Sequence, residues 1–355
     1  MSVAGEDRAA ELLERAATMA AAGDVGGAGE LAVKGARLLP RDDEDRLDTF
    51  RFGAQLLERA GRFAAAADAW AALALDAGDD ATRARARNAE GEAARKAGDW
   101  IRAAAAHTGA LELAEAAFGE STESAAVAQN LAVVFKYTGR FDDAEALYLR
   151  ALSIAEAADD QRLVAVICHN LGGLAHARGD HAQGIPWARR SIEVRARLDD
   201  PVALAGDRGA LAGLLIDAGE HDEARDLLHA ARAVFAEHLG EEDYEVAVVD
   251  GNLATIALAR GDLVEADLRA RACLAGKERH LGDDHPELAV TLTTLGTIRR
   301  RQGDAAHAVA LHRRARAVLA GAVDPDHPLL RTVDENLAVA NEEAASMNRR
   351  RIIQR

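Results

Sequence analysis

The sequence predicts an all-α protein, and three observations support this fold class. Ala, Leu, Arg, Glu and Asp dominate the 355 residues, whereas aromatic residues make up only 4% of the chain. Only six prolines interrupt it, so long windows of helix-forming residues remain. Within these windows, apolar residues recur at helical spacing. Examples are Leu131, Phe135, Leu147 and Leu152 with their apolar neighbours.

Glycines at regular intervals divide the chain into repeating units. Each glycine is followed by Asp, Glu or Arg, and a residue with at most one side-chain carbon stands five positions later. Glycine adopts positive φ at little cost in free energy, and a small residue lets two helix backbones approach closely. Each unit is therefore predicted to be a helix A, a tight turn and a helix B. The glycines are Gly23, Gly61, Gly98, Gly139, Gly179, Gly219, Gly261 and Gly303, and the small residues are Ala28, Ala66, Ala103, Ala144, Gly184, Ala224, Ala266 and Ala308.

Large and small residues also alternate on helix A. Eight residues before each later glycine stands a leucine, which is followed by Ala or Gly. The pairs are Leu131 with Ala132, Leu171 with Gly172, Leu211 with Ala212, Leu253 with Ala254 and Leu295 with Gly296. One hairpin cannot bury such an apolar stripe alone, whereas stacked hairpins can, so the units are expected to form a solenoid.

The joints between units support the same division. The segments HLGDDHPELA (280–289) and VDPDHPLLR (323–331) each place an aspartate before a His-Pro pair. Proline is favoured in the first turn of a helix, and aspartate can cap the free amides there. We therefore expect Asp284 and Asp326 to mark the starts of the next A helices, close to Pro286 and Pro328.

The pattern Gly-x-hydrophobic-x-x-Ala after Asn-Leu-Ala/Gly, in units of about 42 residues joined by LGxDHPxxA-like segments, resembles the tetratricopeptide repeat. The variety that it most resembles is the kinesin light chain type. The resemblance implies one domain over 1–355, a right-handed α-solenoid superhelix of about eight hairpins. It divides into degenerate N-terminal repeats (6–78), well-formed repeats (79–326), a C-terminal capping helix (327–350) and a tail (351–355).

An asparagine stands nine residues before several of the glycines. Asparagine has a low helix propensity, so its presence there suggests a role other than local helix stability. In tetratricopeptide repeat proteins helix A lines a concave groove, and the matching asparagine commonly hydrogen-bonds the backbone of an extended peptide. The resemblance therefore implies that Asn130, Asn170, Asn252 and Asn336 contact a peptide. In the alternative interpretation, these amides bond the neighbouring helix and fix the geometry between repeats.

Other residues are expected on the same face by the family pattern. They are Gln129, Lys136, Tyr137, His169, His176, Thr294, Thr297, Arg300 and Arg301. This row is more basic than the chain as a whole, so an acidic side chain or a C-terminal carboxylate could be held there. Alternatively, it is an ordinary solvated helix face. The small residues Gly173, Gly213 and Thr255 would leave room for ligand side chains or serve tight packing.

Several function classes are disfavoured by the sequence. It contains no GxSxG, P-loop, HExxH or Rossmann glycine pattern, which argues against an enzyme or a cofactor. Capping at a joint explains the cluster at 280–285 better than a metal site does, and adjacent residues such as Cys168 and His169 point to different helix faces. The net charge of −16 opposes general nucleic-acid binding.

The remaining features concern location and partners. Cys168 and Cys273 form no CxxC pair and are expected to be small buried groups in a reducing cytoplasm. No export signal or membrane span is predicted, and the Ala, Arg, Asp and Gly bias is typical of a high-GC bacterial genome. The basic tail 347–355 is expected to complement a helix C-terminus.

The sequence therefore predicts a non-enzymatic scaffold that holds an extended peptide or partner segment in its groove. The alternative is a peptide-sensing regulator whose superhelix changes pitch when a ligand binds, as in bacterial peptide receptors built on similar repeats. Self-assembly into a homo-oligomer through the exposed edge helices stays open.

Overall fold

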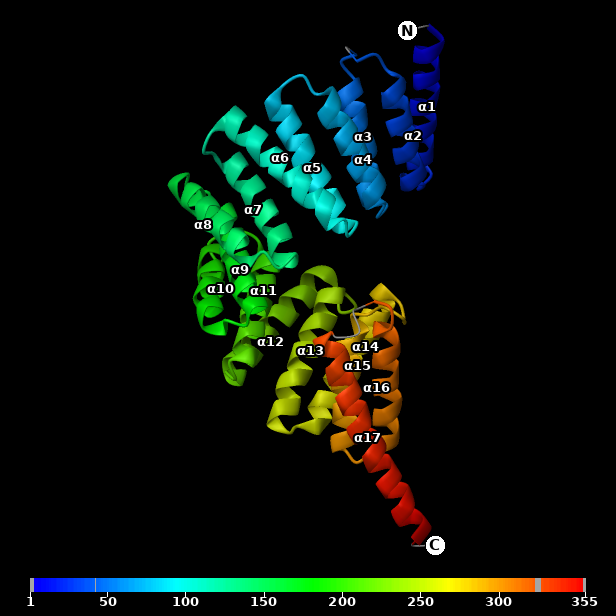
Figure 1. The fold of residues 1–355 in the computed structure, drawn as a ribbon, viewed down its shortest axis with the longest axis vertical. Helices are drawn as coiled ribbons and strands as arrows, with labels where there is room; N and C mark the ends of the chain where they lie inside the picture. Colours follow the sequence, from blue (N-terminus) through cyan, green and yellow to red (C-terminus); the bar gives the residue numbers. More distant parts are fainter. Residues whose placement is uncertain (1–2, 42, 323–326, 354–355) are drawn as a thin grey trace. The chain divides into compact units, whose positions relative to one another are not determined.

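The computed structural model describes residues 3–41, 43–322 and 327–353, and over these residues it consists of helices and short connections (Figure 1). The helices are α1 (Val3–Ala21), α2 (Val25–Leu38), α3 (Arg46–Arg59), α4 (Phe63–Asp76), α5 (Asp80–Lys96), α6 (Trp100–Phe118), α7 (Thr122–Tyr137), α8 (Phe141–Ala157), α9 (Gln161–Arg178), α10 (His181–Arg195), α11 (Pro201–Asp217), α12 (His221–Leu239), α13 (Tyr244–Arg260), α14 (Leu263–Leu281), α15 (Leu288–Arg301), α16 (Ala305–Leu319) and α17 (Pro328–Ile353). The predicted all-α class is confirmed.

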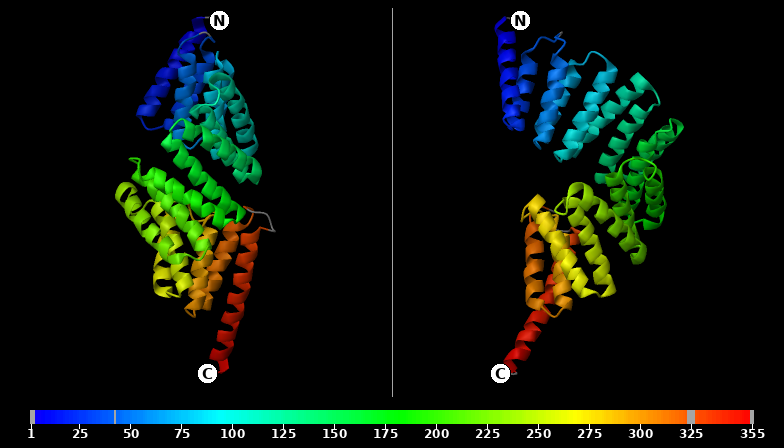
Figure 2. Two further views of the ribbon diagram at one scale, coloured as in Figure 1. Left: turned by 90° about the vertical axis from the view of Figure 1, so that its left-hand side faces the viewer. Right: turned by 180° about the vertical axis from the view of Figure 1, so that it is seen from behind.

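The chain divides into two compact units, residues 1–180 (unit 1) and 181–355 (unit 2). Unit 1 contains the hairpins α1–α2, α3–α4, α5–α6 and α7–α8, followed by α9. Unit 2 begins with α10 and continues with the hairpins α11–α12, α13–α14 and α15–α16 and with α17. Within each unit, successive hairpins stack side by side, as the further views show (Figure 2).

Each unit has two layers, one of odd-numbered and one of even-numbered helices. Odd helices of successive hairpins touch one another: α5 contacts α7 and α7 contacts α9 in unit 1, while α11, α13, α15 and α17 form the same series in unit 2. Among the described residues, no comparable contact joins two even helices. The odd helices are thus more closely spaced, which makes their surface the inner side of each stack. We call this surface the odd-helix face.

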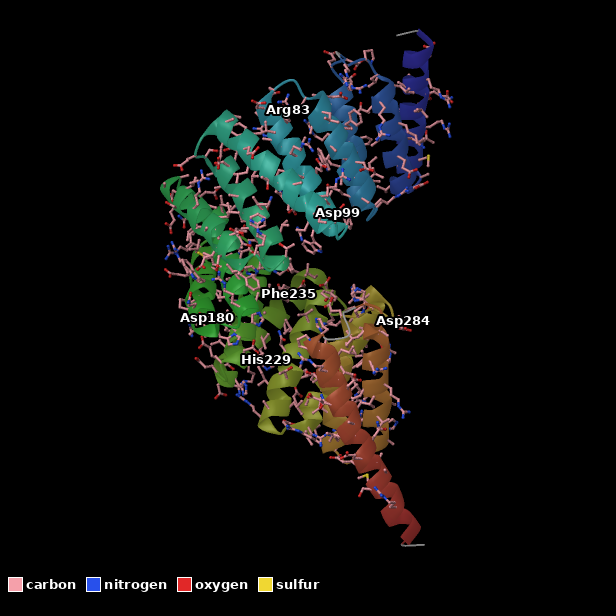
Figure 3. The ribbon with its side chains drawn as sticks, viewed as in Figure 1. Arg83, Asp99, Asp180, His229, Phe235 and Asp284 are labelled. Carbon is pink, nitrogen blue, oxygen red and sulfur yellow. The ribbon has the colours of Figure 1, made fainter. Side chains whose placement is uncertain are left out.

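The predicted turns form at the predicted glycines. All eight adopt positive φ, between 70° and 91°. In four turns the following residue, an aspartate, caps the next helix, so that one dipeptide ends helix A and begins helix B. Asp99 is an example: its carboxylate accepts the backbone N–H of Arg102 over 3.0 Å at the start of α6 (Figure 3). Asp24, Asp262 and Asp304 act likewise. This double use explains the recurring Gly-Asp pair.

The core follows the predicted alternation of large and small residues. The small residues five positions after the glycines are all buried, and so are the leucines of helix A and the residues that follow them. Phe235 on α12 is among the larger side chains of the unit 2 core, where it is 3% exposed (Figure 3). Cys168 and Cys273 are also buried, as predicted. Dispersion and apolar burial between successive hairpins therefore stabilise each stack.

The joint prediction is only partly right. Helix α15 begins at Leu288, two residues after Pro286, and Asp284 does not cap it. Instead, His285 Nδ1 accepts the backbone N–H of Glu287 over 3.2 Å. At the next joint α17 begins at Pro328, as predicted, while His327 Nδ1 accepts the N–H of Leu329 over 3.2 Å. The imidazole thus takes the capping role that was assigned to aspartate; Asp326 lies outside the described residues.

Two further predictions concern domain boundaries and membrane insertion. The single domain over 1–355 and its inner boundaries stay predictions, and α17 runs through the predicted capping helix to Ile353. Along the described parts of the chain, no helix combines the length and the apolar character required to cross a bilayer.

Candidate functional site

The residues predicted to bind a peptide all lie on odd-numbered helices. Four are on α7, three on α9, one on α13, four on α15 and one on α17. They therefore form two groups, one on the odd helices of each unit.

In unit 1, Lys136 is a half-buried cation near the C-terminal end of α7. Its ammonium reaches toward α9, where a Cβ added at Gly173 would lie 3.6 Å from Nζ. Burial lowers the pKa of Lys136, and the nearby Arg95 lowers it further. No carboxylate of the described residues lies within ion-pair distance of this ammonium. Lys136 therefore carries a partly desolvated charge without a counter-ion.

Arg95 on α5, in contrast, has a partner. Its guanidinium forms two bonds to the Glu92 carboxylate, of 3.0 and 3.2 Å. Burial of Glu92 opposes its ionisation, but His107 and Arg95 outweigh this effect and bring the pKa of Glu92 down to about 2. Glu92 is thus charged at neutral pH and neutralises Arg95, so Lys136 supplies the uncompensated positive charge of this surface.

Asn130, six residues before Lys136 on α7, is engaged with a neighbouring repeat. Its Nδ2–H donates to Asn88 Oδ1 on α5 over 3.1 Å. Asn88 also bonds His107 Nδ1, over 3.0 Å. Sequence reasoning missed Asn88 because it stands ten residues before its glycine, whereas Asn130 stands nine before its own. For Asn130, this contact is the inter-repeat bond of the alternative interpretation.

The other predicted residues of unit 1 differ in accessibility. Tyr137 is 61% exposed, and its ring stacks on Trp100 with centroids 5.3 Å apart. Gln129 is only 9% exposed, so little of its amide is available to a ligand. Asn170 is half-buried, and its amide makes no hydrogen bond to the described residues, whereas His169 is half-buried and His176 is exposed. Asn170 is thus the more available amide of this face.

In unit 2, Asn252 on α13 and Thr294 on α15 line a common pocket of about 100 Å³. The Asn252 amide makes no hydrogen bond to the described residues, and the Thr294 hydroxyl donates to the backbone carbonyl of Val290 over 3.0 Å. The pocket continues down to Cys273 on α14. Two predicted site residues from successive repeats are therefore brought together around one cavity.

The remaining predicted residues of unit 2 mostly have partners within the protein. Arg300 forms an ion pair of 2.9 Å with Glu343 on α17, and Arg301 donates to the Leu258 carbonyl over 3.1 Å. Thr297 donates to the Thr293 carbonyl, one turn earlier on α15. Arg300 and Arg301 thus join odd helices, and their charges are less available to a ligand than that of Lys136. Asn336 is half-buried on α17.

A pocket that sequence reasoning missed lies in unit 1. It has a volume of about 250 Å³ and is lined by Trp70, Arg51 and Arg85, among others. Arg51 pairs with Asp48, and the guanidinium of Arg85 lies over the ring of Phe118, 5.2 Å from its centroid. The degenerate N-terminal repeats lack the Asn-Leu pattern, so no sequence signal pointed to this place.

The segments that match a known protein family coincide with repeats of the structure. A family model described as tetratricopeptide repeat matches residues 82–157 and 245–321, which contain most of α5 to α8 and of α13 to α16. No curated protein matches the chain at a significant level.

Several solved structures are similar to this chain at low sequence identity. BtubC (BKLC) from P. vanneervenii is 23% identical over 64% of this chain and 94% of its own, with a TM-score of 0.54. A Rap protein complexed with competence and sporulation factor is 14% identical over 96% of this chain and 99% of its own, with a TM-score of 0.59. A kinesin light chain-like protein of Podosopora anserina with nearly identical TPR-like repeats is 20% identical over 53% of this chain and 90% of its own, with a TM-score of 0.44. The glycine turns and the stacked hairpins agree with the matched segments, which show that the chain contains tetratricopeptide repeats over residues 82–157 and 245–321.

Proposed function

We propose that this protein is a non-enzymatic interaction scaffold whose odd-helix face binds an extended peptide or a segment of a partner protein. The binding groups are side-chain amides and a local positive charge, and neither a cofactor nor a metal takes part. The ligand carries an acidic side chain or a C-terminal carboxylate in unit 1. A cytoplasmic location belongs to the same proposal, because two isolated cysteines are typical of a reducing compartment.

The observation that carries the proposal is the charge state of Lys136. Burying a cation without a counter-ion costs free energy, so proteins rarely keep such a charge without a use for it. A carboxylate placed between α7 and α9 would form a charge-assisted hydrogen bond with Nζ and remove the unpaired state. Gly173 leaves the neighbouring surface of α9 open for a ligand to approach.

Available amides on the same face support a peptide as the ligand. Asn170 stands one turn before Gly173, and its amide offers both a donor and an acceptor to a peptide backbone. Asn252 does the same in unit 2. An extended backbone exposes alternating N–H and C=O groups, which such amides match. The ligand is therefore a peptide in an extended conformation.

The test is a selection of random peptides displayed on phage against the full-length chain, followed by affinity measurements on the enriched peptides. Lys136→Met should weaken peptides that carry an acidic group by about ten-fold or more, since a hydrogen bond to a charged group contributes about 1.5–3 kcal/mol. Asn170→Ala should cost about 1–3 kcal/mol of binding free energy without changing the fold.

Lys34→Met is the matched control, because Lys34 is exposed on the even helix α2. It removes the same charge elsewhere and should leave the affinity unchanged. The triple variant Asn130/Asn170/Asn252→Ala should also lose partner proteins that wild type retains in a pull-down. Failure to enrich any peptide, or equal weakening by both lysine variants, would contradict the proposal.

A second candidate function is a sensor that changes conformation when a peptide binds. The Rap protein of similar fold was solved with competence and sporulation factor, and the present chain divides into two compact units at Asp180. Small-angle scattering with an enriched peptide separates the two functions. A sensor changes its radius of gyration on binding, whereas a rigid scaffold keeps it.

A further inference from the structure

One position of the even helices contributes to the filling of each repeat. Nine residues after each turn glycine, the even helix places a side chain toward its own odd helix. In unit 2 this residue is Ala188 on α10, Leu228 on α12 and His312 on α16, and all three are buried. The His312 ring fills the space beside Gly296 so closely that a Cβ there would lie 2.6 Å from it. Between α12 and α16, α14 carries Ala270 at this position.

The odd helix opposite Ala270 does not compensate for the missing volume. The residue facing this position on α13 is Ala254, so two small side chains oppose each other. Both line the pocket of about 100 Å³, with Cys273 deeper on α14. The space that leucine or histidine occupies in the flanking repeats is thus open to the odd-helix face at this repeat.

The pocket has no net charge. Lys277 is the only charged residue among those that line it, and its ammonium pairs with the Glu287 carboxylate over 3.2 Å. Burial raises the pKa of the Cys273 thiol, whose sulfur lies 3.4 Å from Thr291 Oγ1, so the thiol stays neutral. A charged group entering the pocket would lose hydration without gaining a counter-ion.

The walls and the volume define the size of the occupant. Val248 and Val290 stand on the two odd helices that flank the pocket, and Val290 is 55% exposed without a ligand. An engineered apolar cavity of about 150 Å³ is known to hold a benzene ring. The present pocket, of about 100 Å³, is smaller, so it suits a compact aliphatic side chain better than an aromatic one.

We infer that this pocket, between α13, α14 and α15, selects a compact uncharged side chain, of valine to leucine size, from the peptide bound on the odd-helix face of unit 2. The inference rests on the proposed function. The Asn252 amide lines the same pocket without a bond to the described residues. It bonds the peptide backbone at the residue whose side chain enters, so that one repeat fixes both register and side-chain identity.

The first test uses a small probe and needs no natural ligand. N-acetyl-L-valine N-methylamide is titrated into the full-length protein carrying labelled valine and leucine methyl groups, and methyl resonances are followed by NMR. Saturable shifts are expected at Val248 and Val290. The corresponding phenylalanine and aspartate derivatives should bind at least five-fold more weakly or leave these resonances unmoved.

Filling the pocket should abolish the shifts. Ala270→Leu installs the residue that α12 carries at the equivalent position, and Ala270→Val is a smaller change in case the leucine variant does not fold. Ala272→Leu is the matched control, because Ala272 is exposed on the same helix. Loss of probe binding in the Ala270 variants, with retention in Ala272→Leu, supports the inference. Retained binding in a folded Ala270 variant, or an absence of any shift in wild type, overturns it.

The second test separates this inference from the proposed function. Peptides enriched on the full-length chain are measured against Ala270→Leu and Ala272→Leu. A loss of ten-fold or more in the first variant alone, for peptides with a conserved aliphatic residue, supports the pocket as a selector. Equal affinity for both variants overturns the selector while peptide binding stands. A selection that enriches no peptide contradicts the proposed function, and the probe titration still reports on the pocket.

Discussion

Asn130 and Asn88, which are 42 residues apart in the sequence, are joined by a hydrogen bond of 3.1 Å between the amide of one and the carbonyl oxygen of the other. The same oxygen lies 3.0 Å from His107 Nδ1. An amide oxygen only accepts, so His107 carries its proton on Nδ1. One acceptor therefore ties α7 and α6 to α5 and fixes the spacing of two repeats.

This geometry predicts unequal effects of the two asparagines on stability. Asn88→Ala leaves the Nδ1–H of the fully buried His107 without a partner, which should lower the free energy of unfolding by about 1–3 kcal/mol. Asn130→Ala removes only one bond of a half-buried amide and should cost about 1 kcal/mol or less. Urea denaturation followed by circular dichroism measures both values.

The matched variant for this pair is Asn170→Ala, which removes an amide that makes no hydrogen bond to the described residues. It should change the free energy of unfolding by less than about 0.5 kcal/mol, as surface substitutions usually do. If Asn88→Ala were as mild as Asn170→Ala, the shared acceptor would not hold the repeats together.

A second prediction concerns the turn at Gly139, where φ is 78°. An added Cβ would meet no atom within 4 Å, so any penalty comes from the backbone conformation alone. Gly139→Ala should therefore destabilise the protein by about 1–2 kcal/mol. Gly109, in the interior of α6, also has open space around it but no positive φ. Gly109→Ala should stabilise by about 0.4–1 kcal/mol, and thermal unfolding of both variants should shift in opposite directions.

Features that repeat along the chain could be predicted because they depend on local chemistry. Positive φ at Gly139 and close helix approach at Ala144 are properties of the residue type at a fixed spacing, and eight copies of the pattern made them visible. The unfilled pocket also had a sequence signal. Comparison of Ala270 with Leu228 and His312, at the same distance from their glycines, would have indicated missing volume.

Partners across helices could not be predicted, because they depend on side-chain placement in three dimensions. Asp207 on α11 is 3% exposed and accepts hydrogen bonds of 2.6 Å from Arg195 and 2.7 Å from Ser191. Nothing in the repeat pattern marks this buried network. Likewise, Arg300 was expected to face a ligand, but its distance to Glu343 depends on how α17 packs against α15.

His312 provides the third prediction, which concerns pH. The ring is fully buried, and neither nitrogen has a hydrogen-bond partner among the described residues. Burial lowers the pKa of His312, and the positive charge of Arg300 lowers it further. The folded protein thus keeps this imidazole neutral at pH values where the unfolded chain, with a pKa of about 6.5, already binds the proton.

The direction of the effect follows from proton linkage. Below about pH 6.5 the unfolded state binds more protons than the folded state, so stability falls as the pH falls. The loss approaches about 1.4 kcal/mol for each pH unit until the folded pKa is reached. Above about pH 6.5 both states are neutral at this residue, and its contribution no longer changes with pH.

His312→Leu isolates this contribution, because leucine occupies the equivalent position in the repeat of Leu228. The other eleven of the twelve histidines remain, so their titration cancels when wild type and variant are compared. Between pH 7.5 and 5.5, wild type should lose up to about 1.4 kcal/mol more unfolding free energy than the variant, as measured by urea denaturation at each pH. Parallel stability curves would mean that His312 binds its proton equally in both states, by a partner or a water that offsets its burial.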